Sequence, residues 1–244
     1  MDPAAGGSAG DVLVVLPALD EERNLPEVLD EVRRTTPGAV CLVVDDGSED
    51  ATARVAREQG ARVVSLPFHL GYGVAVQTGI KYGLGHGFGI VVTFDADGQH
   101  DPTDVGPLVD AIRGGADLAI GSRALSARSY QGGRARRWGR RLFATLTRLL
   151  TGLELTDPTS GLRAFGPRAQ ALFACSRFPD RYPDADALVL ARRAQLVIAE
   201  RPARMRPSCN RRSMQGGWRA VAYGFNMLLS LLVAATGRET DLRG

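Results

Sequence analysis

Residues 89–102 read GIVVTFDADGQHDP, an apolar run followed at once by polar side chains. The apolar part predicts a buried strand. Because side chains alternate along an extended chain, Asp95 and Asp97 are expected on the same side, where Gln99 can join them. Carboxylate and amide oxygens are ligands for hard divalent cations such as Mg²⁺ and Mn²⁺. The alternative is a solvated turn at a strand end, where Asp and Gly are also common.

The same alternation of apolar strand and amphipathic helix recurs throughout the first half of the chain. One predicted helix, for example, repeats apolar residues at helical spacing through Leu25, Val28, Leu29 and Val32. Strands that alternate with helices predict βαβ units, and so an α/β fold with a mainly parallel sheet and helices on both faces. The predicted strands are 11–19, 40–48, 62–67, 89–99 and 116–123, and the predicted helices are 24–35, 49–60, 74–87 and 101–115.

The second half is less regular. A basic stretch interrupted by glycines covers 127–152, a loop is expected at 155–166, helices at 167–175 and 184–194, and a strand within 195–205. No internal repeat and no linker rich in Pro, Gly or Ser divides the chain, so we expect one domain. The expected organisation is a disordered tail at 1–10, the α/β domain at 11–217, and an amphipathic helix with a tail at 218–244.

The composition indicates a soluble globular protein of 244 residues, 44% hydrophobic and 23% charged. Its three cysteines, Cys41, Cys175 and Cys209, form no CxxC pair, so we expect neither a disulfide scaffold nor a zinc site. The first residues lack the features of a secretory signal, which predicts a cytoplasmic location. Residues 1–125 carry 9 Lys+Arg and 19 Asp+Glu, whereas residues 126–244 carry 21 and 8. The acidic half suits a cation, and the basic half suits phosphates or an anionic membrane.

Acidic residues follow two other predicted strands. Asp45 and Asp46 end the second strand, and Glu21 lies just after the first. In parallel α/β sheets, ligands bind beyond the carboxyl ends of the strands, so these carboxylates are expected to meet there. Such crowding is repulsive unless a cation or hydrogen-bond donors offset it. As an alternative, Asp46 or Ser48 caps the helix at 49–60.

Taken together, these motifs resemble the family 2 glycosyltransferases of the GT-A fold, a Rossmann-like fold. The resemblance covers about residues 11–236 and is strongest to bacterial relatives of dolichol-phosphate mannosyltransferase, which are polyprenyl-phosphate sugar transferases. It rests on the order of VVLPALDEERNL (14–25), VVDDGSEDAT (43–52), HLGYGVAVQTGIKYG (69–83), VTFDADGQHDP (92–102), GSR (121–123) and DPTSGLRAF (157–165).

The resemblance implies a nucleoside-diphosphate sugar as donor and a divalent cation, Mg²⁺ or Mn²⁺, that stabilises the departing diphosphate. It implies Asp95, Asp97 and Gln99 as the metal ligands, and Arg123 as a catalytic residue that reaches the diphosphate or the acceptor phosphate. The residues that it places around the nucleotide are Pro17, Ala18, Leu19, Glu21, Val43, Asp45, Asp46, Gly73, Gln77, Asp95, Ala96 and Asp97.

The acceptor is where the alternatives stay open. Asp186 matches the position of an acidic residue in many family 2 enzymes and is the candidate base for a hydroxyl acceptor; the alternative is that it caps a helix. A phosphate acceptor is already ionised near neutral pH and needs positive charge rather than a base. The residues expected to bind it are Arg137, Arg163, Arg212 and Ser213. In the segment that ends with Arg212 and Ser213, Ser208 and Asn210 replace the expected Arg and Gly.

Two segments predict contact with a membrane. Five arginines within residues 134–141 precede an apolar run, a pattern typical of a basic amphipathic helix on an anionic surface. Residues 220–236 carry no charge but include Gly224 and Asn226, so we favour an interfacial helix over a spanning one. The alternatives are a solvated face for the arginines and a core helix for 220–236. We expect no nucleic-acid partner, because no RNA-binding motif accompanies the arginines.

These observations predict a metal-dependent, inverting glycosyltransferase that acts on polyprenyl phosphate, peripheral at the inner face of the membrane. One alternative transfers the sugar to a hydroxyl of a small molecule or cell-envelope glycan, with Asp186 as general base. A second is a non-catalytic module that binds nucleotide sugars. A sugar-nucleotide pyrophosphorylase is disfavoured, since such enzymes carry a glycine-rich basic loop after the first strand and PALDEERN (17–24) is not one.

Overall fold

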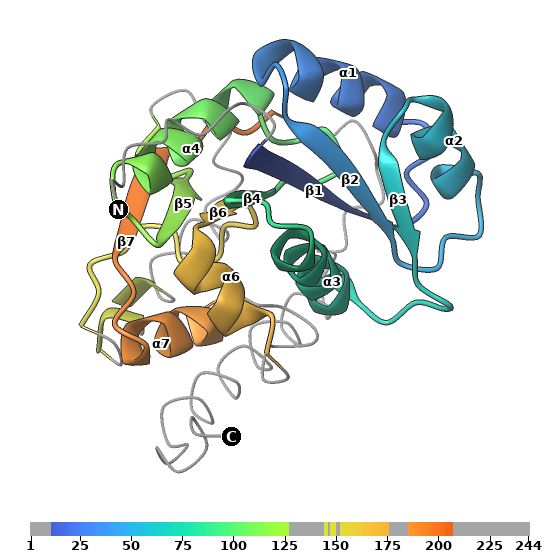
Figure 1. The fold of residues 1–244 in the computed structure, drawn as a ribbon. Coiled ribbons are helices and arrows are strands. Elements are labelled where there is room, and N and C mark those ends of the chain that lie inside the picture. Colours follow the sequence, from blue (N-terminus) through green and yellow to red (C-terminus); the bar gives the residue numbers. More distant parts are fainter. Residues whose placement is uncertain (1–10, 127–143, 146, 150–151, 176–184, 207–244) are drawn as a thin grey trace, which may run out of the picture.

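The computed structural model describes residues 11–126, 144–145, 147–149, 152–175 and 185–206. Within them the chain forms an α/β fold with one central sheet (Figure 1). The strands are β1 (Val12–Ala18), β2 (Val40–Asp45), β3 (Arg62–Ser65), β4 (Ile90–Thr93), β5 (Leu118–Ser122), β6 (Arg163–Phe165) and β7 (Ile198–Pro202). The helices are α1 (Leu25–Thr35), α2 (Thr52–Glu58), α3 (Tyr72–Gly85), the 3-10 helix η2 (Pro102–Asp104), α4 (Val105–Arg113), α6 (Pro167–Phe173) and α7 (Ala185–Arg193).

The sheet confirms the expected mainly parallel topology. Its strand order is β3-β2-β1-β4-β6-β5-β7. β1 pairs in parallel with β2 and β4, β2 with β3, and β5 with β7, whereas β6 runs antiparallel between β4 and β5. The expectation of a loop throughout 155–166 is wrong at its end, because residues 163–165 form β6. Three residues are too few to show a periodic pattern, so only the pairing with β4 and β5 reveals this strand.

The sheet is covered on both faces. Helices α1, α2 and α4 lie on one side and α3, α6 and α7 on the other (Figure 1). Alternate residues of β1 serve the two layers: Val14 and Leu16 pack with Leu29 of α1, whereas Leu13 packs with Ile80 of α3. Burial on both faces explains why the strands are almost continuously apolar.

The strand register brings the polar strand ends to one edge of the sheet. Ala18 is the partner of Asp45, and Val15 is the partner of Thr93. Because β1, β2 and β4 run in the same direction, the residues after all three strands meet at that edge. The site described below is built there.

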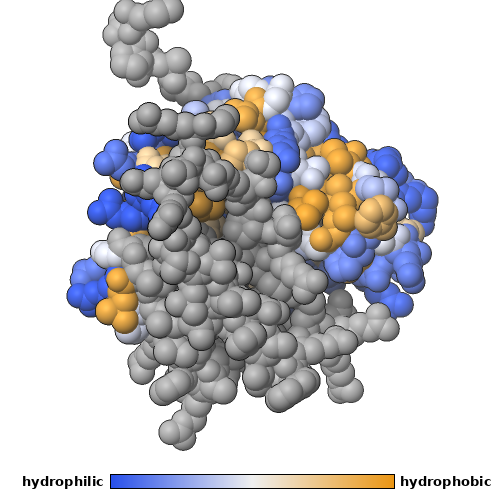
Figure 2. Space-filling view, turned by 90° about the horizontal axis from the view of Figure 1, so that it is seen from below, coloured by the Kyte–Doolittle hydropathy of each residue, from blue (hydrophilic) through white to orange (hydrophobic). Residues whose placement is uncertain are grey.

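The described helices do not include a membrane span: none is long and apolar enough to cross a bilayer. The segments 1–10, 134–141 and 218–244, on which the tail and membrane-contact predictions rest, lie outside the described residues. Seen from below, the surface shows hydrophobic area on the side where β3 and the loop to α3 lie (Figure 2). That loop carries the exposed side chains of Phe68 and Leu70.

Helix α3 packs on β1 through a glycine, and this contact can be tested. A methyl group on Gly79 would overlap the side chain of Val15, whereas one on Gly85, in the same helix, meets nothing within 4 Å. We expect Gly79→Ala to lower the free energy of unfolding by about 1–3 kcal/mol, the usual cost of overpacking. Gly85→Ala should be neutral or raise it by up to about 1 kcal/mol. Urea unfolding of both variants checks this, and equal effects would contradict the close packing.

Candidate nucleotide and cation site

The site lies where β1, β2 and β4 end. Pro17 and Ala18 close β1, Val43 and Asp45 lie at the end of β2, and the Asp95-Ala96-Asp97 sequence begins two residues after β4. The backbone N–H of Asp46 donates to the carbonyl of Ala18 at 2.9 Å, and that of Phe94 donates to Val15 at 2.9 Å. These bonds extend the sheet by one residue and hold the three strand ends together. The structure therefore brings together the residues expected from these strands.

Asp46 organises the loop between β3 and α3. Its buried carboxylate accepts hydrogen bonds from the backbone N–H of Leu70 at 2.8 Å and of Gly71 at 3.0 Å, and His69 Nδ1 lies 2.8 Å away. Both carboxylate oxygens are thus engaged by the protein. Asp46, predicted to contact the nucleotide, is thus bound to the loop 69–71.

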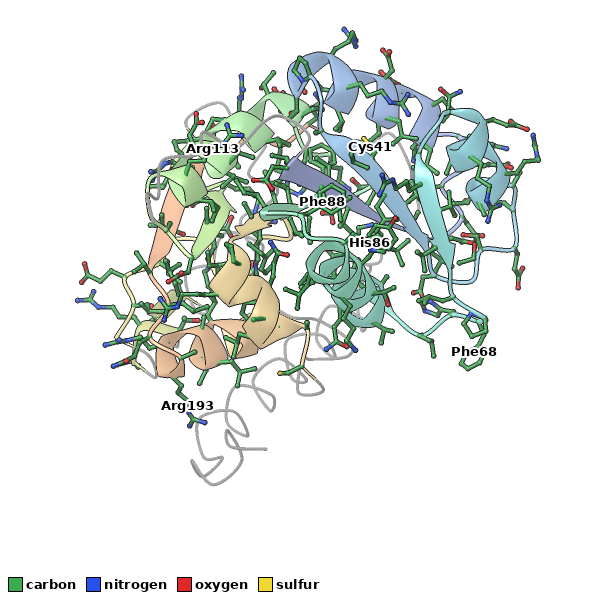
Figure 3. All side chains as sticks on the ribbon, in the orientation of Figure 1. Cys41, Phe68, His86, Phe88, Arg113 and Arg193 are labelled. Atoms are coloured by element: carbon green, nitrogen blue, oxygen red, sulfur yellow. The ribbon has the colours of Figure 1, made fainter. Side chains whose placement is uncertain are left out.

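The turn after Asp46 requires glycine. Gly47 has φ +76°, and a Cβ there would lie 2.5 Å from the carbonyl carbon of Phe68. The backbone of the two loops therefore packs closely. Phe68, 63% exposed, points away from the ribbon (Figure 3).

Asp45 differs from Asp46 in that one of its carboxylate oxygens accepts no hydrogen bond from the described residues. Its side chain is buried, and Oδ1 accepts the N–H of Ser48 at 3.0 Å. Among the described residues none donates a hydrogen bond to Oδ2, so this oxygen can accept from a ligand. The capping alternative is wrong for both Asp46 and Ser48. Asp46 binds the loop 69–71, Ser48 Oγ accepts the N–H of Asp20, and the first N–H of α2, that of Thr52, is accepted by Asp50 at 2.8 Å.

The loop after β1 is tied to the start of α2. Glu21 N–H donates to Thr52 Oγ1 at 2.8 Å, and Glu22 accepts from Ala51 N–H at 3.1 Å. Leu19 is exposed at the mouth of this loop. Burial raises the pKa of Glu21, and the nearby charge of Asp97 raises it further. The charge of Asp97 therefore acts on Glu21.

Asp95 is held by two side chains from different parts of the chain. Tyr72 donates its hydroxyl to Oδ1 at 2.9 Å, and His100 Nε2 lies 3.0 Å from Oδ2. Burial acts to raise the pKa of Asp95. The bond to His100 and its charge, the bond to Tyr72 and the charge of Arg123 outweigh burial and lower that pKa. Asp95 is therefore an ionised carboxylate that the protein has already neutralised in part.

Asp97 lacks such partners. Among the described residues its carboxylate is hydrogen-bonded to Gln99 alone, whose backbone N–H lies 2.9 Å from Oδ1 and whose side-chain amide nitrogen lies 2.5 Å from Oδ2. Burial raises the pKa of Asp97, and the charge of Asp95 raises it further. Ala96 between them is buried, whereas Asp95 and Asp97 are partly exposed. An added positive charge would relieve the repulsion that Asp97 experiences.

The donor set fits a hard divalent cation. The Asp97 carboxylate and the Gln99 carboxamide lie within one short turn, and Gln99 would have to turn its oxygen toward the ion. Asp95, predicted as a third ligand, has both oxygens bound by Tyr72 and His100 and lies beside them as a negative charge. In the described part of the chain no three or more His, Cys, Asp or Glu side chains form a metal cage. Mg²⁺ is commonly held by one or two carboxylates together with substrate phosphates.

Arg123 lies at the end of β5, beside this motif. Its Nε and Nη2 donate to the fully buried Asp157 at 2.6 and 2.7 Å, and Nη2 also donates to Thr159 at 3.0 Å. Such a bidentate pair fixes the guanidinium plane. The structure thus anchors Arg123 through the loop 157–161, and Gly161 of that loop lies beside the Asp95 carboxylate.

The remaining predicted residues fall into those that the structure describes and those outside the described residues. Gln77 donates to the carbonyls of Phe173 and Cys175 at the end of α6, whereas Gly73 is buried in the first turn of α3. Arg163 is 4% exposed and donates to the carbonyls of Pro158 and Ser160, so it braces its own loop. Asp186 is the second residue of α7, and its side chain lies outside the described residues. Arg137, Arg212 and Ser213 also lie outside them.

Sequence reasoning missed four residues that shape the site: Tyr72, His69, His100 as the partner of Asp95, and Asp157. Each one lies inside a motif that was noticed, so the signal was a polar side chain next to the expected ligands. Which carboxylate it would meet depends on the folding of loops from three strands, and no local spacing encodes that.

An α/β fold with this edge site defines a class of nucleotide-binding domains. Residues 13–169, more than half of the chain, match the Glycosyl transferase family 2. The chain belongs to this family, which confirms the resemblance seen in its motifs.

Similar proteins support this assignment. The chain is 38% identical to a polyprenol monophosphomannose synthase of Mycolicibacterium smegmatis over 176 residues, 67% of this chain and 64% of that protein. It is 36% identical to an undecaprenyl-phosphate mannosyltransferase of Micrococcus luteus over 174 residues, 67% of this chain and 68% of that protein. The chain thus spans slightly less than two thirds of the first relative's length.

The fold also resembles that of a solved enzyme. Glucosyl-3-phosphoglycerate synthase from Mycobacterium tuberculosis, crystallised with Mg²⁺ and uridine diphosphate, superposes with a TM-score of 0.69 at 26% identity. The match covers 97% of this chain and 86% of that one. This confirms the expected GT-A architecture and shows that a protein of the same fold binds a divalent ion together with a nucleotide.

The contacts of Asp46 predict a structural cost. Asp46→Asn leaves one acceptor oxygen for three donors, so we expect the free energy of unfolding to fall by about 1–3 kcal/mol. Asp30→Asn is the matched control, because it removes only an exposed ion pair with Arg34, worth about 0.3–0.5 kcal/mol. Denaturant unfolding separates the two variants. Identical losses would show that the loop does not depend on Asp46.

The repulsion at Asp97 predicts that one substitution stabilises the fold and weakens metal binding. A raised pKa means that the charged form of Asp97 destabilises the fold, and this cost appears as pH rises through the folded-state pKa. At pH 7 and without metal, Asp97→Asn should therefore raise Tm, by about 2–4 °C for each kcal/mol removed. The same variant should lose the increase in Tm that Mn²⁺ with a nucleoside diphosphate gives the wild type. A lower Tm in chelator, or an intact shift with Mn²⁺, would contradict this interpretation.

Proposed function

We propose that this chain is a divalent-cation-dependent, inverting glycosyltransferase that moves a sugar from a nucleoside-diphosphate sugar to a polyprenyl phosphate. The observation that carries the proposal is the pair Asp97 and Gln99, at the same sheet edge as Asp45, in a family 2 domain. Relatives whose names specify polyprenol or undecaprenyl phosphate support the acceptor class.

On the donor side, two carboxylates have separate tasks: Asp45, whose Oδ2 has no donor among the described residues, and Asp97, which among them is bound by its neighbour Gln99 alone. Oδ2 of Asp45 accepts an N–H of the base, and the end of β1 at Pro17 and Ala18 provides an apolar wall with Val43. Asp97 and Gln99 hold the cation near the diphosphate. A divalent ion bound there supplies positive charge to the phosphate oxygens of the leaving group. Gly73, buried in the first turn of α3, lets the helix backbone lie close to the donor.

On the acceptor side, a phosphate monoester needs no base. Its oxygen, already ionised, attacks the anomeric carbon from the face opposite the diphosphate, and the bond from that carbon to the diphosphate oxygen breaks with inversion. The phosphate must be held by cations. Arg123 is near Asp95 and fixed in orientation by Asp157, so it can meet an anion without first becoming ordered. We propose Arg137, Arg212 and Ser213 as further acceptor contacts. Arg163, predicted with them, is buried and donates to carbonyls of the loop that anchors Arg123, so we assign it a supporting role there.

The proposal includes a domain layout and a location. Residues 11–217 form the catalytic domain, and residues 218–244 form an interfacial helix with a tail. Contact with the inner face of the membrane then brings the domain to a lipid-linked acceptor. The basic segment 134–141 supports this, since each Lys or Arg near an anionic surface contributes about 1 kcal/mol to binding.

The proposal is tested with labelled nucleotide sugars and undecaprenyl phosphate as acceptor in the presence of Mn²⁺. We expect a lipid-linked sugar phosphate, and Asp186→Asn should retain turnover within about tenfold, because no base is required. Undecaprenol, which carries a hydroxyl in place of the phosphate, is the control acceptor and should give no product.

Two outcomes would contradict the proposal. Transfer to a hydroxyl acceptor that Asp186→Asn abolishes would favour the alternative with Asp186 as general base. Nucleotide-sugar binding without turnover on any phosphate or hydroxyl acceptor would indicate a non-catalytic module.

A further inference from the structure

His100 is a buried histidine with a single polar partner. Its side chain is 2% exposed and lies against the ring of Phe94. Nε2 faces Asp95, whereas Nδ1 has no hydrogen-bond partner among the described residues. Burying an unpaired ring nitrogen costs free energy. The contact with Asp95 is therefore the polar interaction that the position of His100 provides.

The opposite oxygen of Asp95 is fixed from another side. Tyr72, the first residue of α3, donates its hydroxyl to Oδ1. Below this pair lies Gly161, where a Cβ would come within 2.8 Å of the Tyr72 hydroxyl and 3.2 Å of both Asp95 oxygens. Gly161 is itself held by Thr93, whose hydroxyl donates to its carbonyl at 2.7 Å. Tyr72 and His100 thus bind the two oxygens of Asp95, an arrangement that we call the clamp, and Gly161 packs against both oxygens.

The backbone of His100 is anchored as firmly as its ring. It forms a β-bridge with Met205, and the N–H of Arg206 donates to the carbonyl of Gln99 at 2.7 Å. Arg206 in turn binds both carboxylate oxygens of Glu31 in α1. The segment after β7 therefore fixes the turn in which Gln99 and His100 lie, independently of any cation.

We propose that His100 is a positioning residue for the cation site. With Tyr72 it holds the Asp95 carboxylate in one orientation, so that the turn 95–100 presents Asp97 and Gln99 as the ligands that remain available. Asp95 then adds fixed negative charge beside the ion. This inference rests on the proposed function, because it assumes that Asp97 and Gln99 bind a divalent cation.

The test is Mn²⁺ binding, followed by the electron paramagnetic resonance signal of the free ion, with saturating UDP or GDP. His100→Leu keeps an apolar side chain against Phe94 and removes the contact to Asp95. We expect its Mn²⁺ affinity to fall about 10- to 100-fold, as is usual when an outer-shell partner of a metal ligand is lost. His100→Gln retains an N–H donor and should restore most of the affinity. His86→Gln, at the exposed end of α3, is the control and should bind as the wild type does.

Tyr72→Phe keeps the test decisive if His100→Leu does not fold, because it removes one hydroxyl only. Weaker Mn²⁺ binding by Tyr72→Phe would support the clamp. Wild-type affinity in folded His100→Leu, or in Tyr72→Phe, would overturn it, since a purely structural role would change Tm and leave the affinity of the folded protein unchanged. Absence of Mn²⁺ binding by the wild type would overturn the proposed function itself, and the clamp with it.

Discussion

Carboxylates crowd at one edge of the sheet, and their mutual repulsion is the constraint on which the site depends. The register of β1, β2 and β4 brings Asp45, Asp46, Asp95 and Asp97 together, with Glu21 nearby. Carboxylates that lie close together disfavour one another's ionisation unless hydrogen-bond donors or cations offset the repulsion. The loops around this edge are arranged so that some carboxylates are neutralised by the protein and others are left for ligands.

The loop between β3 and α3 does much of this work. Its residues His69, Leu70 and Gly71 bind Asp46, and the next residue, Tyr72, binds Asp95. The carboxylates that follow two of the strands are thus bound by four consecutive residues, 69–72. The segment after β7 completes the arrangement, because it holds the turn that carries Gln99 and His100. What remains is one oxygen of Asp45 and the pair Asp97 and Gln99, which are the groups that suit a base and a cation.

The sequence predicted much of the fold because the strands are continuous apolar runs and the helices carry clear amphipathic spacing. It did not predict β6, whose three residues become a strand only by pairing with β4 and β5. At the site, the sequence identified the carboxylates, but it could not show which of them the protein itself binds and which remain for ligands. Asp45 and Asp46 are neighbours with the same side chain, yet Asp46 faces the loop 69–71, which is more than twenty residues away in the chain. That division depends on tertiary packing and is not written in any local spacing.

The central claim is that Asp97 and Gln99 hold the cation while Asp95 stays bound to the protein. The most direct measurement is anomalous diffraction from crystals of the protein grown with Mn²⁺ and a nucleoside diphosphate. The account predicts one manganese peak, in contact with Asp97 and Gln99 and with the diphosphate, while Tyr72 and His100 still bind Asp95. A manganese ion held elsewhere, or nucleotide bound with no manganese beside Asp97, would contradict it.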